Sequence, residues 1–143
     1  MARWRSAAIE RLPELRETIV KANNVMSLWI DLYFAFENAY RDPRNDDLIA
    51  RIYSYADWCS GAPRCEDARH DPPTAAAVAF YEHVPQTKAA REDMPRWFLY
   101  DDVAGSRSIF SRHICDKAFD ELLLHMKENA NRLVSRKRKR DED

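Results

Sequence analysis

The sequence predicts an all-α fold, either a compact single-domain helical bundle or a short helical-repeat stack, with about six helices. The chain of 143 residues has only 2 glycines against 7 prolines, and the tight turns of antiparallel sheets depend on glycine. Apolar residues recur at helical spacing in several segments. Between Thr74 and Glu82 the segment 74–84 leaves no face toward water when it is placed on a helix, which is typical of a buried helix.

The first half of the chain predicts three helical segments. Residues 3–23 keep a helical apolar period that Pro13 interrupts, so we expect a kink or a short break there. Ser27 is expected to cap a helix that runs to about Tyr40. Asp46 is expected to cap the third helix, which Gly61 ends.

A surface loop is predicted between this helix and the buried one. Residues 60–73 contain glycine, three prolines and five charged groups. Pro73 then lies at or near the first turn of the buried helix 74–84, and Pro85 closes it. Long loops in compact domains often carry function, so the loop is a candidate region for a site.

The second half of the chain predicts shorter elements. A helical turn is expected over 87–93 and an extended connector over 94–98. Asp101 or Asp102 is expected to cap a helix that runs through about His113. Asp116 is expected to cap the last helix, 117–134, whose apolar positions keep the steadiest helical spacing in the sequence.

The composition indicates one globular domain over residues 1–134 and a charged, disordered tail over 135–143. Hydrophobic residues make up 45% and charged residues 33% of the chain. No apolar run approaches the length of a membrane span, and the N-terminus lacks the apolar core of a secretory signal. We therefore expect a cytoplasmic protein without a membrane partner, whose 3 cysteines are reduced thiols.

The net charge of −1 conceals an acidic body and a basic tail. Residues 1–131 hold 17 basic and 21 acidic residues, whereas 132–143 hold six basic and three acidic ones. The tail carries a run of five cations that could contact nucleic-acid phosphates or serve as a nuclear import address, or could be a solvated terminus. Its members are Arg136, Lys137, Arg138, Lys139 and Arg140. The tail has no aromatic residue to stack on bases, which weakens the nucleic-acid hypothesis.

Four residues of metal-ligand type cluster in the middle of the sequence: Cys59, Cys65, His70 and His83. Structural zinc sites usually take their ligands as closely spaced pairs, and no such pair is present. The alternative interpretation makes Cys59 a small buried residue on an apolar helix ridge and leaves Cys65 and His70 in the loop. We expect no metal or other cofactor.

Glu82 and His83 are adjacent polar residues at the end of the buried helix. One hypothesis is a general acid or base of a small metal-dependent or thiol hydrolase that also uses the 59–70 loop. The alternative is structural: His83 interacts with the last helical carbonyls and Glu82 pairs with an arginine.

A further alternative is a recognition surface. Trp58, Tyr81, Arg96 and Trp97 are of the residue types that are enriched in protein-binding hot spots. Aromatic residues make up 11% of the chain, however, and most of them must fill the core.

Four segments resemble a family of small bacterial helical proteins of unknown function. They are IARIYSYADWCSGAP (49–63), AVAFYEHVP (77–85), DMPRWF (93–98) and SIFSRHI (108–114). Small acidic all-α proteins of this kind are sometimes grouped with bacterial antitoxin or immunity proteins, which plug the active site of a toxin. The resemblance implies a helical fold and a partner protein, and it brings no catalytic residues.

The leading functional hypothesis is therefore a non-enzymatic protein-binding module that acts by stoichiometric occlusion of its partner. Its binding face would be acidic, since acidic groups speed the encounter with a basic partner. The candidate residues of that face are Glu66, Asp67, Asp71, Trp97, Asp101 and Asp102, with Trp97 as an anchor.

Overall fold

The computed structural model describes residues 1–130, and their secondary structure is entirely helical, as the sequence predicts. Contacts between residues divide the chain after Tyr81 into two compact units. Unit 1 comprises Met1–Tyr81, and unit 2 begins at Glu82. The tail 135–143 and the cations Arg136 to Arg140 lie outside the described residues. The prediction of one domain over 1–134 stays a prediction.

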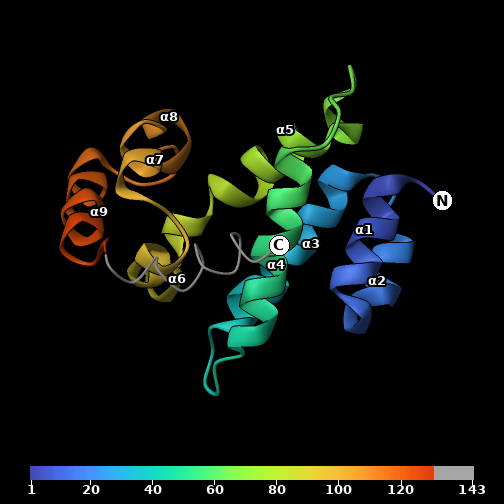
Figure 1. Ribbon diagram of the computed structural model, residues 1–143, viewed down its shortest axis with the longest axis horizontal. Coiled ribbons are helices and arrows are strands. Elements are labelled where there is room, and N and C mark those ends of the chain that lie inside the picture. The colour runs from blue at the N-terminus through green and yellow to red at the C-terminus, as the bar shows by residue number, and fades with distance from the viewer. Residues whose placement is uncertain (131–143) are drawn as a thin grey trace. The chain divides into compact units, whose positions relative to one another are not determined.

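Unit 1 contains five α-helices (Figure 1). They are α1 (Arg3–Arg11), α2 (Arg16–Lys21), α3 (Val25–Ala39), α4 (Asp46–Ser60) and α5 (Pro72–Ala76). α1 packs on α2 and on α4, and α5 packs on both α3 and α4. The break predicted near Pro13 is present, as a single 3-10 turn at Pro13–Leu15 between α1 and α2.

The N-caps of the two long helices, α3 and α4, lie earlier in the sequence than predicted. Asn24 caps α3 by accepting a hydrogen bond from the Ser27 amide, and the Ser27 hydroxyl accepts one from the Asn24 amide. Asn45 caps α4 by accepting from the Leu48 amide, which places Asp46 inside the first turn. The predictions for Ser27 and Asp46 were wrong because each lies close after an asparagine that caps equally well. Gly61 ends α4 as predicted.

The predicted buried helix 74–84 is not a uniform α-helix. α5 begins at Pro72, and the chain widens into a π-helical turn at Ala77–Tyr81 (η3). Phe80 is fully buried, as the packing prediction requires, whereas the Val78 residue is 42% exposed. The segment therefore has one face toward solvent, in contrast to the prediction that it has none.

Aromatic side chains build the centre of unit 1 around Phe80. The Phe80 ring stacks on Trp29 with a centroid distance of 4.8 Å. It also meets the edges of Phe36 at 5.0 Å and Tyr53 at 5.4 Å. All four side chains come from different positions on α3, α4 and η3, so this one cluster joins those elements.

Unit 2 contains four α-helices within the described chain (Figure 1). They are α6 (Lys88–Asp93), α7 (Tyr100–Ala104), α8 (Arg107–Phe110) and α9 (Asp116–Glu128). α9 packs on α6 and α7, and its side chains Phe119, Leu122 and Met126 are buried.

Four predictions for unit 2 were wrong. Met94–Arg96 is a 3-10 helix and not an extended connector, because Pro95 fits a first helical turn and the Trp97 amide bonds back to the Met94 carbonyl. The helix expected up to His113 is divided between α7 and α8, with a turn at Gly105. The caps of α7 and α9 are Leu99 and Cys115, so Asp101, Asp102 and Asp116 lie in first turns.

Candidate functional site: a tryptophan-lined pocket

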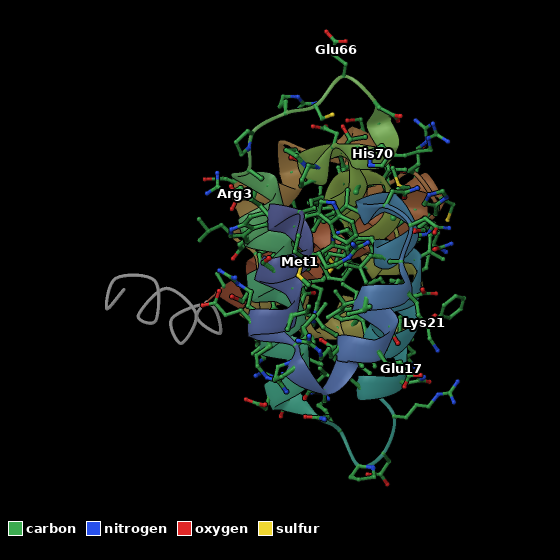
Figure 2. The ribbon with its side chains drawn as sticks, turned by 90° about the vertical axis from the view of Figure 1, so that its right-hand side faces the viewer. Met1, Arg3, Glu17, Lys21, Glu66 and His70 are labelled. Carbon is green, nitrogen blue, oxygen red and sulfur yellow. The ribbon has the colours of Figure 1, made fainter. Side chains whose placement is uncertain are left out.

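A pocket of about 490 Å³ lies on unit 1, a volume in the range of ligand sites. It forms where the start of α1 meets the last turn of α4 and the loop that follows. Its lining residues are Arg3, Trp4, Asp57, Trp58, Gly61, Ala62, Pro63, His70 and Pro72. Figure 2 labels two of them, Arg3 and His70, which are both exposed.

The aromatic walls of the pocket are held in place by the core behind them. The Tyr55 hydroxyl donates a 2.8 Å hydrogen bond to the Trp4 carbonyl, which ties α1 to α4. The Trp58 ring is nearly parallel to Tyr55, with a centroid distance of 6.0 Å and an angle of 8°. Tyr55 stacks in turn on Trp29 at 5.3 Å. A fixed aromatic wall of this kind loses little side-chain entropy when a ligand binds.

Asp57 supplies the acidic group of the pocket. It lies in the last turn of α4, where the Tyr81 hydroxyl donates to its Oδ1 at 3.3 Å. The carbonyl end of a helix carries partial negative charge, and no basic residue lies in this last turn. Asp57 and the helix end therefore both favour a positively charged group here.

The loop wall is anchored by Asp71. Its Oδ1 accepts from the Cys65 amide at 2.7 Å, and its Oδ2 accepts from the Thr74 amide at 3.2 Å and from the Thr74 hydroxyl. The Thr74 hydroxyl and the Cys65 amide hold the pKa of Asp71 below its usual value. With an exposure of 1%, Asp71 is not accessible to a partner. Asp71 holds the loop in place. It does not belong to an exposed acidic face, in contrast to the prediction.

The other residues of the predicted acidic face have varied surroundings. Glu66 points outward at the tip of the loop, as Figure 2 shows. The exposed Asp67 caps the turn at 68–70 and pairs with Arg69 at 3.2 Å. Asp101 and Asp102 are exposed on α7, in unit 2.

Trp97 is not the exposed anchor that the sequence suggested. The residue is only 8% exposed, and its indole Nε1 donates to Asp93 Oδ2 at 3.1 Å. The Arg96 guanidinium lies over the ring at 5.2 Å from its centroid. Trp97 is thus a core residue of unit 2.

The cysteine and histidine candidates do not form a metal centre. Cys59 is fully buried, and its Sγ accepts a 3.4 Å hydrogen bond from Trp29 Nε1. Burial raises the pKa of the Cys59 thiol to about 11. Cys65 and His70 are exposed, and His83 is in unit 2. Within residues 1–130 no group of His, Cys, Asp and Glu side chains could hold a metal ion.

A second polar cluster in unit 2 contains the predicted pair Glu82 and His83. Glu82 Oε1 lies 3.4 Å from Nε2 of His113, and the His83 and His113 rings stack with centroids 4.3 Å apart. His83 Nδ1 also lies 2.6 Å from Gln86 Oε1. Sequence reasoning missed His113, because it is distant in sequence from Glu82 and His83 and was predicted only as the end of a helix.

Comparison of the chain with protein-family models, curated proteins and solved structures found no match in any of the three. The resemblance to small bacterial helical proteins therefore stays a prediction. None of the helices in the described part of the chain is long and apolar enough to span a membrane.

Proposed function

We propose that this protein is a non-enzymatic binding module that recognises another protein through the tryptophan-lined pocket of unit 1. The pocket carries the proposal, since it joins two tryptophans with one acidic group in a preformed hollow. Tryptophan is among the residues that contribute most to binding energy at protein interfaces. Rigid aromatic walls also suit a protein that binds its partner without rearrangement.

The mode of action we propose is stoichiometric occlusion. Glu66 and Asp67 lie on the loop that continues from the pocket wall, and both are exposed. Asp67 pairs with Arg69, so Glu66 is the acidic group of the two that would attract a basic partner and raise its association rate. An immunity- or antitoxin-type inhibitor, the role implied by the resemblance, would use such a surface to cover a toxin's active site.

The setting we propose is the cytoplasm. The three cysteines are all free thiols, although two of them are exposed and could be oxidised outside the cell. A reducing compartment preserves exposed thiols in this state.

Site-specific photo-crosslinking tests the proposed function. A benzophenone amino acid replaces Ala62, which lines the pocket, and in a matched variant it replaces Phe34, an exposed aromatic residue on α3 outside the pocket lining. We expect one defined partner to be crosslinked in native lysate from position 62 and not from 34. Trp58→Ala in the Ala62 variant should abolish the product. Equal products from both positions, or none, would contradict the proposal.

A second candidate function is general acid–base catalysis by unit 2. The contact between Glu82 and His113 favours it, because a carboxylate that orients an imidazole is a recurring arrangement in hydrolases. Screening of ester, phosphoester and peptide substrates with the intact protein and with His113→Asn tests it. Turnover that is lost in His113→Asn would support catalysis, whereas turnover that is unchanged would exclude this cluster as its source.

A further inference from the structure

We propose that the pocket binds the guanidinium group of an arginine side chain on the partner. This inference rests on the proposed function and names the chemistry that the pocket recognises. Three features carry it: an aromatic stack that ends in the pocket, a carboxylate beside the last ring, and the carbonyl end of a long helix.

The aromatic stack favours a flat ligand. It runs from Phe80 through Trp29 and Tyr55 to Trp58, with successive centroid distances of 4.8, 5.3 and 6.0 Å. The first three rings are fully buried, whereas Trp58 is half-buried and lines the pocket. Trp58 is therefore the last ring of the series, and a planar group in the pocket would continue it. Guanidinium groups are planar and stack readily on tryptophan.

The negative groups at the end of α4 favour a cation in the pocket. Asp57 is the residue just before Trp58, so its carboxylate and the last ring reach the pocket from the same helical turn. A carboxylate offers about four acceptor sites, so Asp57 can bind a guanidinium in addition to its present partners, which include the Tyr81 hydroxyl. Charge-assisted bonds from arginine to a carboxylate are among the strongest hydrogen bonds in proteins. The carbonyl end of α4 adds to the same attraction.

Arg3, which is positively charged, and His70 also line the pocket. Both are exposed, so solvent screens them more than the half-buried Asp57. Arg3 can turn its long side chain into water when a second cation enters. An acidic residue next to the bound arginine would pair with Arg3, which favours a partner sequence that combines arginine with aspartate or glutamate.

Binding of three blocked amino acids to the full chain tests this inference. N-acetyl-arginine amide is flat and charged, N-acetyl-citrulline amide is flat and neutral, and N-acetyl-lysine amide is charged without a planar head. Titration is followed by the NMR signal of the Trp58 indole N–H, which Trp58→Phe assigns. We expect the arginine compound to bind at least about tenfold more tightly than either of the others. Citrulline or lysine binding as tightly as arginine would overturn the inference.

Two charge-removing variants separate recognition from folding. Asp57→Asn keeps an acceptor for the Tyr81 hydroxyl but removes the charge, so arginine binding should fall about tenfold and approach that of citrulline. Asp31→Asn, an exposed acid on α3 outside the pocket lining, should leave binding unchanged. Both variants should keep the amide spectrum of the folded chain. Unchanged arginine binding in a folded Asp57→Asn variant would contradict the inference.

The two proposals can fail separately. If none of the three compounds shifts the Trp58 signal while the crosslinker at position 62 still captures a partner, the guanidinium inference is wrong and the binding function stands. If neither experiment gives a signal, both are wrong.

Discussion

Burial sets the chemical reactivity of single residues in this protein, and the three cysteines show the difference. Cys59 is enclosed in the core with a pKa raised to about 11, whereas Cys65 and Cys115 are exposed. The thiolate is the reactive form of cysteine, and burial suppresses both its formation and its access to reagent.

We therefore expect a thiol reagent such as DTNB to modify two cysteines per native chain rapidly at pH 8. The third should react only when the chain is unfolded in denaturant. Cys59→Ala should keep the two rapid equivalents and lose the slow one. Three rapid equivalents in the native chain would show that Cys59 is accessible.

Asp71 gives a pH-dependent prediction. Its folded pKa lies below the ordinary value of 3.8, so the unfolded chain binds the proton more readily. Its stabilising effect is therefore complete at neutral pH and is lost as the pH falls through the lowered pKa. Asp71→Asn keeps the shape of the cap but not its charge, and should reduce the free energy of unfolding by about 1 kcal/mol at pH 7.

The check is urea unfolding of wild type and Asp71→Asn at pH 7 and near pH 3. The difference in stability between them should shrink at the lower pH. Glu66→Gln, which alters the exposed acid at the loop tip, should match wild type at both values. A difference that stays constant with pH would refute the assignment.

At the scale of elements, the two glycines lie at helix ends. The position of Gly61 has room for a side chain, whereas the position of Gly105 does not. Both have negative φ, so neither position needs glycine for its backbone conformation. A Cβ at Gly105 would lie 2.9 Å from the Asp101 carbonyl oxygen, but at Gly61 the nearest atom would be 3.8 Å away.

Gly105→Ala should therefore reduce the free energy of unfolding by about 1 kcal/mol, since the backbone at the end of α7 must shift. Gly61→Ala should raise it by about 0.5 kcal/mol, because alanine restricts the unfolded chain. Urea midpoints of the two single variants measure both effects, and effects of the same sign would contradict this account.

The elements that the sequence predicted well are those with a long apolar period. α3, α4 and α9 follow from the 3.6-residue spacing of their buried side chains. Their first residues were harder to predict, because Asn24 and Ser27 can both cap and in fact act together. The π-helical turn at Ala77–Tyr81 has no sequence signal, since alanine and aromatic residues suit an ordinary α-helix equally well.

At the scale of the whole molecule, each unit has its own core. Phe80 is central to unit 1, and Phe119, Leu122 and Met126 are buried in unit 2. A substitution that weakens one core should therefore increase local unfolding more in its own unit than in the other unit.

Phe80→Ala should reduce the free energy of unfolding of unit 1 by about 4 kcal/mol, because it removes a fully buried ring from the aromatic cluster. Hydrogen exchange is the measurement, and α4 amides should lose more protection than α9 amides. The control is Phe34→Ala, which removes a residue that is 60% exposed and should change little. Equal loss of protection in α4 and α9 would show that the two units unfold as one.

The pocket lay beyond sequence reasoning because it exists only in the folded chain. Trp4, Trp58 and Pro72 come from three segments, and none is close enough to another in sequence to indicate a shared site. The sequence singled out Trp58 as a recognition residue but grouped it with Trp97, which is buried in unit 2. Hydrophobic periodicity identifies the buried face of each helix, whereas the pocket depends on how the helices pack against one another in three dimensions.

The stack from Phe80 to Trp58 also has an optical consequence. Aromatic rings held within about 6 Å of one another couple their electronic transitions. The folded protein should therefore have a strong near-ultraviolet circular dichroism signal that arises from unit 1. A ligand in the pocket would perturb Trp58, the last chromophore of this series, so the circular dichroism signal would report occupancy of the proposed binding site without an attached dye.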